Sequence, residues 1–233
     1  MNYHFDFDVL LHGQYRDWLL DGLWTTLQLS GVSLVFALLL AIIVAVMRMS
    51  PLKTLRAISA SYVEFVRNTP LLVQMLFWYF GASQLFSDSA AQWLYAHNYE
   101  FVAAAFALVF YTAAFMAEDI RSGFRAIPRE QMEAARASGL SFLQSVRFVV
   151  LPQAMRVSVP PLISQALNLI KNSSLAMAIG VAELTYQARQ IESYTFKSFE
   201  AFAAATVLYL VISLIVTAAG HLYATRARGR IYA

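Results

Sequence analysis

The chain has no cysteine and few histidines, and both shortages narrow what it can be. With 0 cysteines among 233 residues, disulfide bonds and thiolate metal sites are excluded. The four histidines are scattered without ligand spacing and are typical of interfacial or loop positions: His4, His12, His97 and His221. We therefore expect no metal site in this chain.

Catalytic and nucleotide-binding motifs are missing as well. No His-Glu-x-x-His run and no pair of aspartates falls inside an apolar stretch, which argues against an intramembrane enzyme. None of the 9 glycines belongs to a Gly-x-x-x-x-Gly-Lys-Ser/Thr loop, so the chain cannot bind ATP through a P-loop. We expect no cofactor here, and the energy source must be another subunit.

Apolar residues, in contrast, are abundant. They make up 59% of the sequence, charged residues make up only 13%, and the mean hydropathy is +0.56. This balance is far from that of an ordinary soluble domain. Because a spanning helix needs about 20 residues, the length allows five or six spans and excludes a large soluble catalytic domain. The composition predicts an all-α integral membrane protein.

Five stretches are apolar enough to be spans. They cover residues 23–47, 62–86, 101–117, 157–182 and 201–223, which form one predicted transmembrane domain over residues 23–225. The N-terminal segment, residues 1–22, has four aspartates and no basic n-region, so we expect a retained first span rather than a cleaved signal peptide. Residues 226–233 form a tail.

Lysines and arginines predict the orientation, because cytoplasmic loops are enriched in them. Twelve fall on one side of the predicted spans: Arg48, Lys53, Arg56, Arg121, Arg125, Arg129, Arg136, Arg147, Arg156, Arg226, Arg228 and Arg230. Three fall on the other side: Arg16, Arg189 and Lys197. This bias predicts an external N-terminus and a cytoplasmic loop at residues 119–156. The net charge of +3 then reflects topology rather than nucleic-acid binding.

The loop at residues 119–156 is predicted to contain two short helices joined at a sharp corner. Pro128 suits the first position of a helix over residues 129–138, and Gly139 supplies a left-handed stop. This first helix exposes small alanines among charged residues, so a partner surface can approach closely.

A capping box predicts the second helix. Ser141 is followed three residues later by Gln144, which is the spacing of that motif. We expect Leu151-Pro152 to end this helix before the fourth span.

This loop resembles the EAA loop of bacterial ABC importer permeases. The matching positions are Glu133, Ala134, Ala135, Gly139, Val149, Leu151 and Pro152. Val149 stands where that family usually has isoleucine. In the family the loop is a coupling helix that inserts into a cleft of the ATPase subunit. The resemblance therefore implies that these residues, Val149 apart, couple the chain to ABC ATPase subunits, which bind the ATP and magnesium.

Further stretches look like those of polar amino acid permeases, with glutamate/aspartate importer subunits most similar. They are residues 64–74, 159–161, 168–174 and 179–180, and the similarity runs over all five predicted spans. It implies a multi-pass protein of the bacterial inner membrane with a second permease subunit, in a heterodimer or a homodimer. It also implies a periplasmic or extracellular amino-acid-binding protein that delivers the substrate.

Two ionisable residues lie close together near the start of the second predicted span. A charge at membrane depth costs roughly 2.5 to 3.5 kcal/mol or more and usually faces a cavity or a partner. Glu64 and Arg67 are three residues apart, so they could pair on a helix. Arg67 could instead contact the substrate.

A second polar cluster begins at Lys171, inside the fourth predicted span. Asn172, Ser173 and Ser174 follow at once, as is typical where a helix breaks beside a cavity. Lys171 could instead have a structural role, in which its side chain packs against neighbours or extends its charged end to the membrane surface. No unpaired carboxylate lies in the cluster, which favours an acidic or neutral polar amino acid over a cationic one. The predicted substrate-pathway residues are Glu64, Arg67, Asn68, Asn168, Lys171, Asn172, Ser173 and Ser174.

Together these features predict a permease subunit that moves polar amino acids across the inner membrane by alternating access. Glutamate and aspartate are the predicted substrates. Five spans are too few to enclose a pathway alone, so we expect a pair of such subunits. One alternative is the same importer for glutamine or another polar amino acid. Another is a non-transporting membrane adaptor, which would need no polar cluster at mid-membrane.

Overall fold

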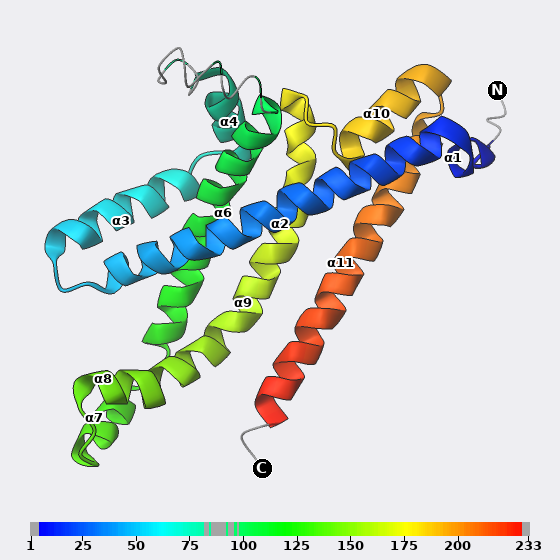
Figure 1. The fold of residues 1–233 in the computed structure, drawn as a ribbon. Helices are drawn as coiled ribbons and strands as arrows, with labels where there is room; N and C mark the ends of the chain where they lie inside the picture. Colours follow the sequence, from blue (N-terminus) through cyan, green and yellow to red (C-terminus); the bar gives the residue numbers. More distant parts are fainter. Residues whose placement is uncertain (1–4, 82–83, 85–91, 93–95, 97, 230–233) are drawn as a thin grey trace. The chain divides into compact units, whose positions relative to one another are not determined.

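The computed structural model describes residues 5–81, 84, 92, 96 and 98–229 (Figure 1). The elements described here are helices, with no strand among these residues. The α-helices are α1 (Asp8–Leu11), α2 (Gly13–Met49), α3 (Lys53–Arg67), α4 (Leu71–Leu76), α6 (Tyr99–Arg125), α7 (Arg129–Ala137), α8 (Phe142–Ser145), α9 (Leu151–Asn172), α10 (Leu184–Thr195) and α11 (Ser198–Gly229). Two π-helical segments, η1 (Phe77–Gly81) and η3 (Val146–Val150), and one 3₁₀ segment, η4 (Ser173–Ile179), complete them.

Among the described residues, three helices are long and apolar enough to cross a membrane. They are Gly13–Met49, Tyr99–Arg125 and Ser198–Gly220. These helices contain most or all of the first, third and fifth predicted spans, and polar turns lengthen α2 and α6 beyond the apolar stretches. α2 and α6 therefore run further than hydropathy alone predicts.

The second predicted span is wrong as one continuous helix. α3 ends at Arg67, α4 begins at Leu71, and η1 follows it. Pro70 lacks an N–H and disfavours helical backbone at the residue before it. The side chains of Asn68 and Thr69 donate to the carbonyls of Glu64 and Phe65 near the end of α3, at 2.7 and 3.0 Å. Residues 82, 83, 85 and 86 of this prediction lie outside the described residues.

The prediction that Leu151-Pro152 ends a helix is also wrong. α8 continues through the π turn of η3 into α9, and Pro152 is the second residue of α9. Proline lacks a donor and crowds the carbonyl four residues earlier, and the wider π turn accommodates both effects. Directly after this proline, the Gln153 side chain donates to the carbonyl of Val149 at 2.9 Å.

The chain divides into two compact units, and several helices contribute to both. Unit 1 contains residues 1–35, 70–109 and 168–215, and unit 2 contains residues 36–69, 110–167 and 216–233. In unit 1, buried side chains from α1, α2, α10 and α11 form a core: Leu10, Leu19, Leu184, Ala188, Ile191, Ala201 and Ala205.

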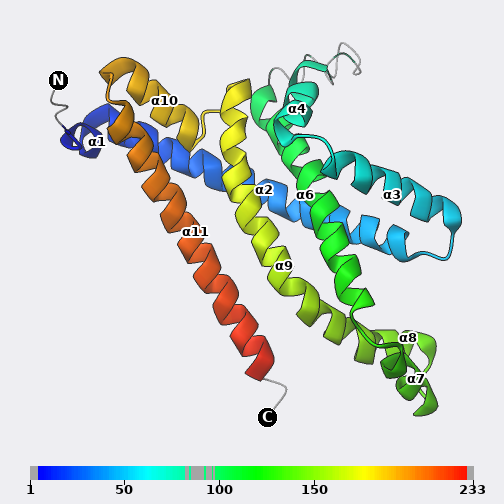
Figure 2. The same cartoon turned by 180° about the vertical axis from the view of Figure 1, so that it is seen from behind.

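Small residues let the helices of unit 2 approach closely. A Cβ atom on Gly123 of α6 would lie 1.9 Å from Ser158 Oγ and 2.9 Å from the carbonyl oxygen of Ala154, both in α9. Near the end of α11, a Cβ on Gly220 would lie 2.7 Å from Ile163 Cγ2. Such contacts are typical of helix packing in membranes. The contacts of Gly123 hold the C-terminal end of α6 beside the beginning of α9. In both views α7 and α8 lie next to these two helix termini (Figures 1 and 2).

Candidate functional site

The loop predicted to be a coupling helix is helical at the expected position. α7 covers Arg129–Ala137, with Pro128 at its N-cap rather than at its first helical position. Gly139 has a φ of 87°, and its N–H donates to the carbonyl of Arg136 at 3.0 Å. The N–H of Leu140 donates to the carbonyl of Ala135 at 3.3 Å. This bond pair is a Schellman motif, so the predicted left-handed stop is confirmed.

The capping box on the other side of the corner is confirmed as well. The N–H of Gln144 donates to Ser141 Oγ at 3.3 Å, and the N–H of Ser141 donates to Gln144 Oε1 at 2.8 Å. The corner is therefore held by bonds local to residues 135–144.

The six predicted coupling residues do not share one surface. Glu133 and Ala134 are exposed on α7, whereas Ala135 is buried toward α8 and η3, against which α7 packs. Gly139 is exposed at the corner. Leu151 and Pro152 lie in α9, where Leu151 lines an apolar cavity. The structure thus separates an exposed α7 face from residues that support it.

Three large apolar side chains stand exposed beside α7, and the sequence analysis missed them. Phe142 and Phe148 are each 61% exposed, and Leu143 is 76% exposed. Exposed apolar residues that gather on a polar loop are typical of a docking surface. The signal was present in the sequence, since two of them directly follow the capping serine.

Glu64 and Arg67 do not pair, although their spacing permits it. Both side chains are exposed, and the guanidinium of Arg67 lies over the Phe115 ring at 5.1 Å from its centroid. An exposed ion pair gains little in free energy, while an aromatic face offers a guanidinium a comparable attraction. The predicted pair is therefore replaced by a contact between α3 and α6.

Two neighbouring carboxylates of α6 make polar contacts with other helices of unit 2. Glu118 forms ion pairs with Arg48 of α2, at 3.3 Å, and with Arg121, one turn further along α6. Asp119 accepts a hydrogen bond from Gln165 Nε2 of α9 at 3.0 Å. These groups link α2, α6 and α9, and the sequence analysis had treated Asp119 only as the start of a loop.

The cluster at Lys171 lies where α9 tightens into η4. Ser173 Oγ donates to the carbonyl of Ile170 and Ser174 Oγ to the carbonyl of Lys171, each at 2.7 Å. Helical geometry therefore changes at the predicted place, by a 3₁₀ turn rather than a full break. Lys171 is exposed and pairs with no carboxylate among the described residues, while Asn168 is exposed and Asn172 half-buried.

Glu183 is a buried acid that the sequence analysis did not single out. It caps α10 by accepting from the N–H groups of Thr185 and Tyr186, at 2.9 and 2.8 Å, and also accepts from the Tyr209 hydroxyl at 2.7 Å. Burial raises the pKa of the Glu183 carboxyl, and the hydrogen bonds partly oppose that shift. Glutamate is not one of the residues usually preferred at an N-cap, but its negative charge is favourable at a helix N-terminus.

Across the part of the chain that the structure describes, no group of three or more histidine, aspartate or glutamate side chains could hold a metal ion. His4 and His97 lie outside that part.

Comparison with known proteins identifies the family. The family model described as "Binding-protein-dependent transport system inner membrane component" matches residues 37–229. The probable amino-acid ABC transporter permease protein PatM of Vibrio harveyi is 38% identical over 213 residues, covering 91% of this chain and 92% of that protein. The probable glutamine ABC transporter permease protein GlnM of Bacillus subtilis is 38% identical over 197 residues, covering 84% of this chain and 86% of that protein. The glutamate/aspartate import permease protein GltJ of Escherichia coli is 34% identical over 206 residues, covering 87% of this chain and 84% of that protein.

A solved structure agrees with this assignment. A chain from the crystal structure of an amino acid ABC transporter with histidines has a TM-score of 0.84 and 32% identity, and the match covers 96% of this chain and 100% of that one. The predicted all-helical permease fold and inner-membrane location are confirmed. The protein is a transport subunit rather than an enzyme, and ATP is bound by an ATPase partner. The chain belongs to the family of binding-protein-dependent transport system inner membrane components, the permease subunits of ABC importers.

Proposed function

We propose that this chain is a permease subunit that moves polar amino acids into the cell, with glutamate and aspartate as its main substrates. The observation that carries the substrate class is Lys171, an exposed cation at the change from α9 to η4 with no acidic partner among the described residues. An acidic side chain is the matched ligand for such a group. The name of GltJ, with 34% identity, supports the same substrate pair.

Glutamine is the second candidate, because GlnM is named for it and shares 38% identity with this chain. A glutamine amide can accept hydrogen bonds from the same polar groups but gains no charge pairing with Lys171. The two substrates therefore differ in one interaction. The non-transporting adaptor has less support, since the family is one of transport components.

The membrane arrangement we propose has five spans with the N-terminus outside. α2, α6 and α11 supply three of them. The second, at residues 62–86, includes the end of α3, the break at residues 68–70, α4 and η1, and the fourth, at residues 157–182, includes most of α9 with η4. The twelve-to-three distribution of lysine and arginine supports the orientation. Residues 23–225 then form a single transmembrane domain.

Coupling to the ATPase is assigned to the loop at residues 119–156. The exposed face of α7, with Glu133 and Ala134, and the neighbouring apolar side chains Phe142 and Leu143 form a surface suited to a partner. ATP-driven approach of two ATPase subunits would act on this surface and reorient the helices. The complete importer contains two ATPases, a binding protein and a second permease subunit, either a further copy or a relative.

Uptake measurements test the substrate assignment. Cells lacking this gene are assayed for labelled glutamate, aspartate, glutamine and arginine, with and without complementation by the intact chain. We expect selective loss of glutamate and aspartate uptake. In the reconstituted importer, with each amino acid supplied separately at high concentration, Lys171→Ala should weaken transport of glutamate more than that of glutamine, because only glutamate loses a charge pair. Equal loss of both substrates would show that Lys171 has a structural role.

A further inference from the structure

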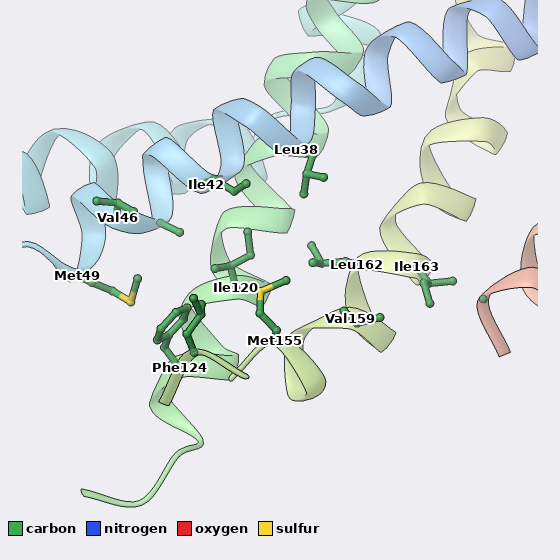
Figure 3. Close-up of a pocket in the computed structure, with 13 residues that line it drawn as sticks. Leu38, Ile42, Val46, Met49, Ile120, Phe124, Met155, Val159, Leu162 and Ile163 are labelled. Atoms are coloured by element: carbon green, nitrogen blue, oxygen red, sulfur yellow. The ribbon is translucent and has the colours of Figure 1, made fainter. Parts of the chain in front are cut away.

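An apolar cavity in unit 2 is not used by any step of the transport proposal. It has a volume of about 560 Å³ and lies among α2, α6, α9 and the Gly220 region of α11 (Figure 3). Its 13 lining residues carry no polar side chain. Leu38 and Ile42 of α2, Ile120 of α6 and Leu162 of α9 surround the open space. A polar amino acid has no partner in such a cavity, so it is not part of a substrate path.

The length of the cavity matches one leaflet of a bilayer. Along α2 the lining runs from Leu38 to Met49, and these twelve residues span about 16 Å along the helix axis. Half of the hydrocarbon core of a bilayer is about 15 Å thick. The Met49 end lies at the last residue of α2, close to the end of α6 at Phe124 and the beginning of α9 at Leu151. In the membrane arrangement proposed above, with the Met49 end at the cytoplasmic surface, the cavity would extend from that surface toward the middle of the bilayer.

Four arginines are sequence neighbours of residues that line the cavity: Arg48 beside Met49, Arg121 beside Ile120, Arg125 beside Phe124 and Arg156 beside Met155. Asp119 is the other sequence neighbour of Ile120, and its carboxylate accepts a hydrogen bond from Gln165. The carboxylate of Glu118 neutralises part of this charge by pairing with Arg48 and Arg121. Arg125 and Arg156 are exposed and form no ion pair with any described residue. This end of the cavity is therefore positively charged.

We propose that this cavity binds one acyl chain of an anionic phospholipid, with its headgroup phosphate held by Arg125 and Arg156. The apolar lining fits the chain, the length fits one leaflet, and the two unpaired guanidinium groups fit the phosphate. A lipid bound there would contact the ends of α2 and α6 and the beginning of α9, next to the loop that carries α7. The inference rests on the membrane location of the family and not on which amino acid is transported.

Native mass spectrometry of the complete importer tests this site. The complex is taken from nanodiscs of phosphatidylcholine with phosphatidylglycerol, and the lipid retained on the permease is counted. We expect preferential retention of phosphatidylglycerol. Each arginine near the surface strengthens attraction to an anionic lipid roughly fivefold, so the double variant Arg125→Gln/Arg156→Gln should retain it about 25-fold more weakly. Arg189→Gln, an exposed arginine outside the cavity, is the control.

A second variant distinguishes binding of the lipid's acyl chain from binding of its headgroup. Leu162→Trp fills the cavity and should abolish retention, while Val211→Trp, at an exposed apolar position of α11 outside the cavity, should not. Equal retention of the two lipids, or unchanged retention in the double arginine variant, would overturn the proposal. Since the chain has 0 cysteines, Leu162→Cys introduces the single thiol of this chain. Its efficient cross-linking to a second permease copy would instead assign the cavity to an interface between copies.

Discussion

The corner at Gly139 offers a direct test of how the coupling loop works. Its φ of 87° is left-handed, a conformation that costs a residue with a Cβ roughly 1 to 2 kcal/mol. A Cβ built there meets no atom within 4 Å, so Gly139→Ala adds conformational strain without a clash. That strain corresponds to a factor of about 5 to 30 in the population of the correctly folded corner. A helix of 9 residues has little stability of its own to offset this loss.

We expect Gly139→Ala to reduce substrate-stimulated ATP hydrolysis by the reconstituted importer, while membrane insertion stays intact. Gly139→Pro should abolish the stimulation, because proline fixes φ near −65° and removes the N–H that bonds to Arg136. Glu133→Ala should abolish it too if the exposed face of α7 is what the ATPase contacts.

Gly13 provides the matched control. It also has a positive φ, 67°, and a Cβ there also meets no atom within 4 Å, but it begins α2 in the N-terminal segment. Gly13→Ala therefore introduces the same kind of strain away from the coupling loop. Full stimulation in Gly139→Ala, or equal losses in both variants, would refute the reasoning that this corner positions α7.

Two further predictions concern stability and are measured by thermal unfolding of the purified permease. Gly123→Ala should destabilise unit 2 by about 1 to 3 kcal/mol, because its Cβ would overlap Ser158 Oγ and a backbone carbonyl. The matched helical substitution Gly31→Ala meets no atom within 4 Å and should be neutral or stabilise by up to about 1 kcal/mol, and equal effects would contradict this account of the packing. Glu183→Ala should cost about 1 to 3 kcal/mol, because it leaves two N–H groups of α10 and a tyrosine hydroxyl without their acceptor. Burial raises the pKa of Glu183 above its ordinary value of 4.5, so its contribution is complete below that pH and falls as pH rises through the folded-state pKa. Glu183→Gln should remove this part of the pH dependence, and an unchanged profile would show that Glu183 is not its source.

The parts of the fold that sequence predicts well are those set by local bonds. The corner at Gly139 and the capping box at Ser141 and Gln144 involve residues no more than five apart, so their residue types and spacing determine the geometry. The three long apolar helices are predicted for a similar reason, because lipid requires every backbone group to bond within its own helix. Glu183 belongs to the same class, since an acid just before a helix is a local signal.

Proline shows where local rules conflict. Pro70 breaks the second predicted span, whereas Pro152 lies inside a helix that continues. The difference is in what accommodates each proline. Before Pro70, the side chains of Asn68 and Thr69 bond back to α3 and end it. Before Pro152, a π turn widens the backbone and the helix continues through the proline. Asn68 and Thr69 are visible in the sequence, but a hydropathy average over the whole span conceals them.

Polar contacts between helices are the hardest part to predict, and they decide which charges are available to a ligand. Glu118 meets Arg48 across 70 residues of sequence, and Asp119 meets Gln165 across 46. Arg67 has a carboxylate at helical spacing and yet lies against an aromatic ring of α6. Sequence spacing shows only which partners are possible, and packing selects among them. Lys171 is an exposed cation that forms no ion pair with the described residues and lies beside a change of helix type. Arg67 is held against an aromatic ring, so Lys171 is the better candidate to meet an acidic substrate.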